Sequence, residues 1–328
     1  MNSNHPTETA ADLAAVAALL EIAEELGVSP LLDRAEPFTL ADLADAGAMP
    51  EEGAAGLLEA LVACDLVVRN GDPQKFTPSA DMVQRRYESG YLSWAMTANR
   101  PFLDYAPAFF RDPAGAAERF QRDGRRVAVS SRWVGSKGFY PAAFATILDG
   151  RPARIADLGA GAGALVINVL RELDTTSGVV LDMSPAACAE ATRAASDAGV
   201  ADRVQVVNRR IESLVDDPSP VAGADLVHAG FVLHDIAADP ETLEAVLRGC
   251  RVAMAPGGRL VVTDAVPFAP GPRERRFSAL FTYLHSAFMG VRLPTEEQWL
   301  ARFRAAGFAD VSCAEHRMPG GRMFVATV

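Results

Sequence analysis

The sequence predicts an α/β protein, with a mostly parallel sheet in the second half of the chain and a helical domain before it. Three observations support this fold class. The first half has the apolar spacing of helices, and the second half alternates short apolar runs with helical stretches. The last two β-prone runs, separated by a turn at 318–321, predict a terminal antiparallel hairpin.

Length and composition indicate an ordered chain of two domains, or of one domain with an appendage. The chain has 328 residues, and a domain takes about 100–200. Hydrophobic residues make up 49%, which excludes a disordered chain, and the net charge of −11 disfavours nucleic acid and anionic membranes as partners. Four cysteines without a CxxC pair indicate a reducing, cytoplasmic location. We find neither a signal peptide nor an apolar run of about 20 residues.

The first 85 residues have the element order of a winged helix. Helical stretches at 8–28 and 51–64 precede a hairpin signal around Asn70-Gly71. The fold is used both for DNA binding and for dimerisation. We favour dimerisation, because the stretch from 51 begins with two glutamates and carries no Lys or Arg. The sequence predicts that residues 86–150 form a helical connector that roofs an active site. It predicts that residues 151–328 form the sheet domain.

In the sheet domain, strands are expected at five places, with helical stretches between several of them, as in βαβ units. These strands lie at 154–158, 178–184, 204–208, 224–230 and 257–266.

The loop after the first of these strands carries the chemistry of a cofactor site. Gly159, Gly161 and Gly163 permit a tight turn and a close approach of backbone N–H groups to a ligand. Asp182 ends the next strand, where a carboxylate can accept hydrogen bonds from ribose hydroxyls. Asp157 stands two residues before the first glycine.

Two cofactors fit this loop. A dinucleotide site requires G-x-G-x-x-G/A, which Ala164 completes, whereas an S-adenosylmethionine site requires an acid before G-x-G-x-G. We favour the methyl donor, because Asp157 can hold its cationic part and a pyrophosphate needs no such acid. The position of the loop in the second half and the terminal hairpin support the same choice.

On these motifs the chain resembles the class I methyltransferases, and over nearly its whole length the caffeate/acetylserotonin O-methyltransferase type. The resemblance implies a Rossmann-like sheet, S-adenosylmethionine as cofactor and a homodimer formed through the N-terminal domain. One departure concerns the adenine, which this family holds with an acid after the third strand. Arg210 stands there instead, and a guanidinium can stack on the purine.

The five histidines limit what imidazole chemistry is possible. His234-Asp235 follows the fourth strand, where a His of the related enzymes removes a proton from the substrate hydroxyl. Asp264 follows the fifth strand, but Arg292 stands near where a second acid is expected, so the acid–base set is incomplete. His285 lies near the end of an apolar helix. It fits either a core position, with its ring bonded to a carbonyl, or a metal triad with His234 and Asp235.

For the other three histidines we expect no catalytic role. His5 falls in a tail, His228 in the fourth strand and His316 in an exposed hairpin.

A closer resemblance, to the metal-dependent α-keto acid C-methyltransferases of nonribosomal peptide pathways, favours the triad. The matches are His234-Asp235, His285, Met289-Gly290, Leu293-Pro294-Thr295, Phe120-Gln121-Arg122-Asp123 and Ser93-Trp94.

This resemblance implies methylation of a 2-oxo acid at Cβ, with a metal such as iron or zinc on the triad. It implies that Arg122 binds the substrate carboxylate and that Trp94 lines the pocket. Phe231 and Met289 are further pocket candidates. Two alternatives stay open: an O-methyltransferase with His234 as base, and a ligand-sensing regulator that binds DNA.

Overall fold

The computed structural model describes residues 6–34, 36–69 and 71–328 and divides the chain into two compact units, Met1–Gly138 and Phe139–Val328. His5 and Asn70, which the sequence analysis placed in a tail and a turn, lie outside the described residues. Residues 86–138 of the expected connector belong to the first unit, and 139–150 belong to the second.

The first unit begins with four helices and a small hairpin, as a winged helix requires. The helices are α1 (Pro6–Glu25), α2 (Ser29–Leu32), α3 (Leu40–Ala46) and α4 (Glu51–Ala63), followed by strands β1 (Val67–Arg69) and β2 (Phe76–Pro78). The hairpin is antiparallel, and α3 starts at a capping box in which Thr39 and Asp42 bond each other's backbone N–H. Leu20, Leu43 and Leu61 are fully buried in the core of this part.

The rest of the first unit is helical, as predicted. Its elements are α5 (Met82–Leu92), the π-helix η1 (Ser93–Ala98), α6 (Arg100–Asp104), α7 (Ala106–Arg111), α8 (Pro113–Arg119) and α9 (Gly124–Gly138). The wide turn of a π-helix is uncommon and is frequently found at functional sites. Here it carries Trp94.

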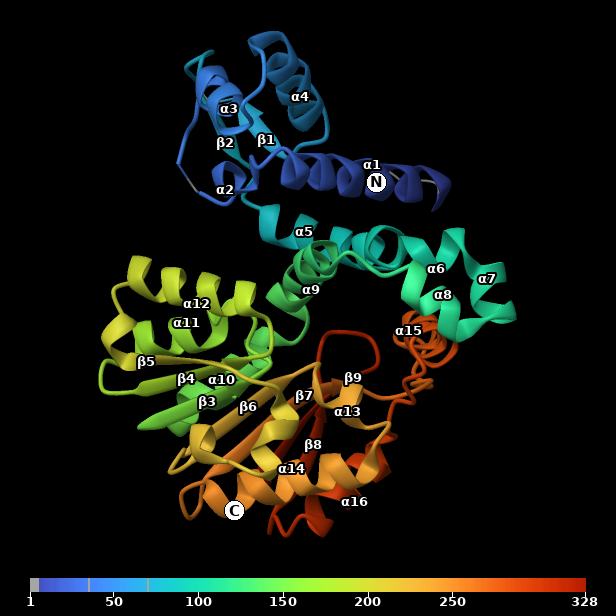
Figure 1. Ribbon diagram of the computed structural model, residues 1–328. Coiled ribbons are helices and arrows are strands. Elements are labelled where there is room, and N and C mark those ends of the chain that lie inside the picture. The colour runs from blue at the N-terminus through green and yellow to red at the C-terminus, as the bar shows by residue number, and fades with distance from the viewer. Residues whose placement is uncertain (1–5, 35, 70) are drawn as a thin grey trace. The chain divides into compact units, whose positions relative to one another are not determined.

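The second unit is built on a seven-stranded sheet with the order β5-β4-β3-β6-β7-β9-β8 (Figure 1). Its strands are β3 (Arg154–Leu158), β4 (Ser177–Asp182), β5 (Val204–Asn208), β6 (Leu226–Gly230), β7 (Arg259–Ala265), β8 (Val311–Glu315) and β9 (Gly321–Thr327). The first five run parallel, and β9 pairs antiparallel with both β7 and β8. The strand order reverses between β3 and β6, which places a ligand site at their carboxyl ends.

Helices cover both faces of this sheet (Figure 1). The helices of this unit, in chain order, are α10 (Tyr140–Gly150), α11 (Ala164–Glu172), α12 (Pro185–Asp197), α13 (Leu233–Ile236), α14 (Pro240–Ala253), α15 (Arg275–Phe288) and α16 (Glu296–Ala305), with short 3₁₀ turns η2 (Ala201–Arg203), η3 (Ile211–Val215) and η4 (Ser219–Val221). One core packs α14 and α16 on the sheet around Leu243 and Trp299. The other packs α10, α11 and α12 around Ile147 and Val166. The predicted fold class and terminal hairpin are confirmed.

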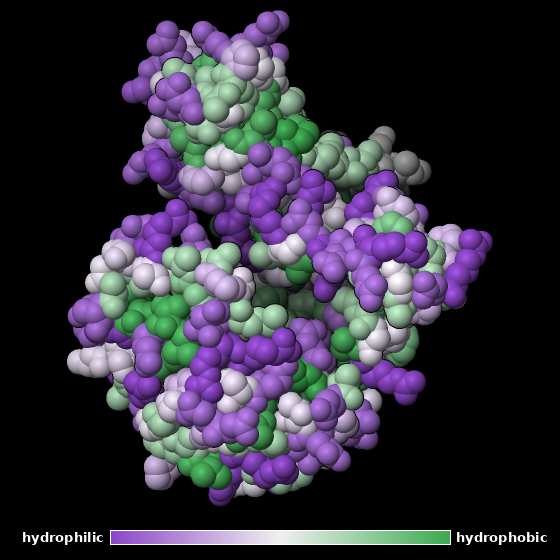
Figure 2. Space-filling model, in the orientation of Figure 1, coloured by the Kyte–Doolittle hydropathy of each residue, from purple (hydrophilic) through white to green (hydrophobic). Residues whose placement is uncertain are grey.

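The surface seen in Figure 2 is mixed, with hydrophilic residues separating patches of hydrophobic ones. Within the described ranges, every helix is too short or too polar to cross a membrane.

Candidate functional site: a cofactor loop and a paired-histidine centre

Gly159, Gly161 and Gly163 all adopt left-handed backbone angles, with φ of 67°, 55° and 74°. L-amino-acid residues, which carry a Cβ, rarely adopt this conformation. A Cβ on Gly159 would lie 2.5 Å from a methyl of Val232, and one on Gly163 would lie 3.0 Å from Val180. A Cβ on Gly161 would meet nothing within 4 Å. Packing therefore requires the outer glycines, and the middle glycine faces open space where a ligand can approach.

Asp182 is held against this loop. Its carboxylate accepts hydrogen bonds from the backbone N–H of Gly161 at 2.9 Å and of Ser184 at 2.8 Å. These bonds place the acid at the carboxyl end of β4 beside the open glycine, as a ribose site requires.

Arg210 follows β5, and its side chain is 64% exposed. It pairs with Glu212 at 2.6 Å, and that hydrogen bond and charge raise the pKa of the guanidinium above its usual value. The structure therefore shows a cation where related enzymes are expected to have an acid.

Asp157 is buried and bonded to a histidine that the sequence analysis treated as structural. The Nδ1 of His228 lies 2.7 Å from Oδ1 of Asp157, and the two residues face each other across the β3–β6 pairing. Strand register brings them together although they stand 71 positions apart. In the sequence, only the alternation of side chains along the two strands could have predicted that Asp157 and His228 lie on the same face of the sheet.

His234 begins the second part of the site and lies between two carboxylates. Its Nδ1 is 2.6 Å from Oδ1 of Asp264, which is fully buried, and its Nε2 is 3.4 Å from Oδ1 of Asp235. The backbone N–H of His234 also donates to Asp264 at 3.2 Å. Negative charge on both sides of an imidazole stabilises positive charge there, either an imidazolium or a bound cation.

His285 comes from α15 and meets His234 ring to ring, with centroids 5.1 Å apart and planes at 80°. Its Nδ1 donates to the carbonyl of Phe281 at 2.7 Å, and both histidines are 4% exposed. A proton on Nδ1 places the lone pair on Nε2, and such an outer hydrogen bond is usual for histidines that bind a metal. The carbonyl bond is also what a purely structural core histidine makes.

The three expected metal ligands do not form a complete site. Among the described residues no group of three or more His, Cys, Asp or Glu side chains has the arrangement to hold a metal ion. Asp235 lies beside Nε2 of His234, but its side chain is 65% exposed. The structure therefore brings the two imidazoles together, but it does not bring all three expected ligands into one metal site.

Phe231 stands directly after β6 with φ of 54°, a strained angle for a bulky residue. Its ring packs against those of Phe139 and Phe281, with centroids 4.5 and 6.4 Å away. These three aromatic rings lie beside the imidazole pair, because Phe281 also stacks on His285. Met289 caps α15, four residues after His285, and is half-buried.

The prediction that His316 lies in an exposed hairpin is wrong. It is 5% exposed, within 6.1 Å of the Phe231 ring, and neither ring nitrogen has a hydrogen-bond partner. Burial, together with the positive charge of Arg322, lowers the pKa of His316 to about 4. The polar pattern of the segment hid this, because the aromatic rings beside His316 come from distant parts of the chain, Phe139 and Phe231.

Trp94 and Arg122 belong to the first unit, and there they lie close to a common neighbour. Trp94 is 6% exposed, and its carbonyl accepts a hydrogen bond from the side chain of Asn99 at 2.8 Å. Arg122 donates to the other end of that amide at 3.4 Å and lies over the ring of Phe102. The fully buried Asn99 therefore links the two residues expected to bind substrate.

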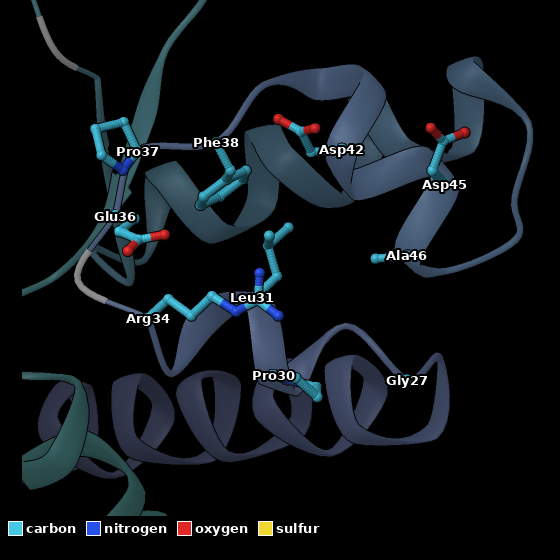
Figure 3. Close-up of a pocket in the computed structure, with 10 residues that line it drawn as sticks. All are labelled: Gly27, Pro30, Leu31, Arg34, Glu36, Pro37, Phe38, Asp42, Asp45 and Ala46. Carbon is cyan, nitrogen blue, oxygen red and sulfur yellow. The ribbon is translucent and has the colours of Figure 1, made fainter. Parts of the chain in front are cut away.

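The winged helix offers an acidic surface. A hollow of about 360 Å³ opens between α2 and α3, and Figure 3 shows Arg34 entering it from one side and Asp42 and Asp45 carried on α3. Glu51 and Glu52 occupy the first turn of α4, whose 13 residues include no Lys or Arg. The carboxylates of α3 and α4 repel a phosphate backbone.

A family model described as "Methyltransferase domain" matches residues 156–260. The chain is 30% identical to a 2,7-dihydroxy-5-methyl-1-naphthoate 7-O-methyltransferase of Streptomyces carzinostaticus, over 76% of each chain. It is 33% identical to the aclacinomycin 10-hydroxylase RdmB of Streptomyces purpurascens, over 51% of this chain and 41% of that one. It is 32% identical to an indolepyruvate C-methyltransferase of Streptomyces griseus, over 49% and 48%. The chain thus spans less than half of the length of the last two relatives.

The structure of human N-acetylserotonin methyltransferase in complex with SAM superposes with a TM-score of 0.59, over 100% of this chain and 99% of that one, at 19% identity. That similarity concerns the fold. The glycine loop with Asp157 and Asp182 lies within the matched family region, and the naphthoate relative covers both units. The chain therefore belongs to the class I S-adenosylmethionine-dependent methyltransferases of the small-molecule O-methyltransferase type.

Proposed function

We propose that this protein transfers a methyl group from S-adenosylmethionine to Cβ of a small 2-oxo acid in specialised metabolism. The observation that carries the proposal is the buried pair His234 and His285, with carboxylates on both sides of His234. Such a centre favours positive charge, and it can stabilise the negative charge that develops when a Cβ proton leaves. The 32% identity to an indolepyruvate C-methyltransferase supports the same acceptor class.

The donor side is assigned to the glycine loop. Gly161 leaves room for the cofactor, Asp182 accepts from ribose hydroxyls, and Asp157 attracts the cationic part of the donor. Arg210 offers a planar cation to the adenine. During transfer the Cβ–CH₃ bond forms as the CH₃–S bond breaks, so the sulfonium becomes a neutral thioether and the Cβ proton is released.

On the acceptor side, Arg122 pairs with the substrate carboxylate through its planar guanidinium, and Trp94 packs on the substrate. Asn99 holds both residues in place. Phe231 and Met289 supply apolar surface beside the imidazole pair.

A metal ion, with iron or zinc as the candidates, belongs to this proposal, and His234, His285 and Asp235 would hold it. When bound, it supplies Lewis-acid polarisation of the acceptor carbonyl. The chain's own contribution is to orient the two rings, through Asp264 and through the carbonyl of Phe281.

The test offers the protein a methyl-labelled donor and a panel of 2-oxo acids, with mass spectrometry of the products and elemental analysis of the protein. We expect a label on Cβ and about one metal ion per chain. His285→Ala should lose both. The matched control is Ser286→Ala, an exposed neighbour on the same helix, which should lose neither. Full Cβ methylation by metal-free protein would refute the metal assignment, and transfer to none of the 2-oxo acids would refute the acceptor class.

A second candidate is O-methylation of a phenolic small molecule with His234 as general base. The 2.6 Å contact between His234 and Asp264 favours it, because a buried carboxylate orients the ring and stabilises the imidazolium. This candidate predicts an ether product, indifference to chelators and tolerance of His285→Ala.

A further inference from the structure

His228 and Asp157 form a buried pair at the centre of the sheet, with His228 2% and Asp157 4% exposed. A carboxylate only accepts hydrogen bonds, so Nδ1 of His228 donates across the 2.7 Å contact.

We propose that His228 is a positioning residue for Asp157. The 2.7 Å contact from Nδ1 of His228 is buried on both sides, and it fixes the rotamer of the Asp157 carboxylate on β3.

The consequence concerns the methyl donor, and here the inference rests on the proposed role of Asp157 in attracting the donor's cation. The ring N–H of His228 holds the buried Asp157 carboxylate in one orientation. A donor ammonium is attracted more strongly to a carboxylate that is already oriented than to one that must first be reoriented.

The test measures binding by calorimetry with no acceptor present, so its outcome is separate from the choice between 2-oxo acid and phenol. His228→Leu should weaken S-adenosylmethionine binding about tenfold, which is about 1.4 kcal/mol. His228→Asn, whose amide can still donate to Asp157, should recover part of the loss. 5′-Methylthioadenosine lacks the amino-acid part of the donor, so its affinity should stay within twofold in both variants.

Two results would overturn the positioning role. One is unchanged S-adenosylmethionine affinity in folded His228→Leu, and the other is an equal loss for both ligands, which would indicate general damage to the loop. The melting temperature shows whether a variant has folded. If His228→Leu has not folded, the positioning role is judged on His228→Asn alone, from its loss of affinity for S-adenosylmethionine relative to its loss of affinity for 5′-methylthioadenosine.

Discussion

Asp264 is fully buried and accepts hydrogen bonds from the ring and the backbone of His234 and from the backbone of Ala265. These bonds set the orientation of His234 before any ligand arrives, so little reorganisation is needed during the reaction. Both proposed reactions use this contact. It orients a metal ligand in one and a general base in the other.

Asp264→Asn tests that contact. An amide presents either an N–H or an oxygen to Nδ1, and it carries no charge to stabilise an imidazolium. We expect kcat to fall by about 100-fold or more, with the melting temperature little changed because the two side chains have the same shape. Steady-state kinetics check this, and a kcat within threefold of wild type would contradict it.

Because His316 is buried, we expect the free energy of unfolding to depend on pH. Its pKa in the folded protein is about 4, below the ordinary value of 6.5, because burial and Arg322 oppose the charged form. The unfolded chain therefore binds more protons between these values, so stability falls as the pH drops from about 6.5 to about 4. The full effect of this one group is about 3 kcal/mol.

His316→Leu should remove that loss. Denaturant unfolding of the variant at pH 7 and pH 4.5 should show a smaller decrease in unfolding free energy than wild type shows. Equal decreases in the two proteins would contradict the assignment.

At the scale of elements, a buried ion pair ties the hairpin strand β9 to the start of α15, which carries His285. Nη1 of Arg322 lies 3.0 Å from Glu274, and the residues are 6% and 3% exposed. Burial alone would raise the pKa of Glu274, but the hydrogen bonds from Arg322 and from the backbone of Gly320 lower it below its usual value.

Arg322→Met should leave Glu274 as a buried unpaired charge and reduce the unfolding free energy by about 3–5 kcal/mol. The double variant with Glu274→Met should recover most of that loss, because a buried pair replaced by apolar side chains is often neutral. Chemical denaturation of the two variants checks this. Equal losses in both would show that the ion pair itself, and not the unpaired acid, decides the stability.

At the scale of the whole molecule, the charge of −11 requires local cations wherever an anion binds. In the proposed function, Arg122 supplies such a cation for the carboxylate of a 2-oxo acid. We propose that the winged helix serves dimerisation and binds neither nucleic acid nor membrane, in agreement with the acidic first turn of α4.

Light scattering should therefore give a mass near twice 34.8 kDa. Titration with duplex DNA at physiological salt should show no binding. Salt-dependent DNA binding would revive the regulator hypothesis.

The sequence by itself determined the fold class, the glycine loop and the terminal hairpin, because periodicity and left-handed glycines are local properties. It also selected His234, Asp235 and His285 as a group through resemblance. Tertiary structure alone decided which side chains meet. Strand register brings His228 to Asp157, the end of β7 brings Asp264 to His234, and the rings of Phe139 and Phe231 lie beside the buried His316. These contacts join residues far apart in the chain, so no local pattern encodes them.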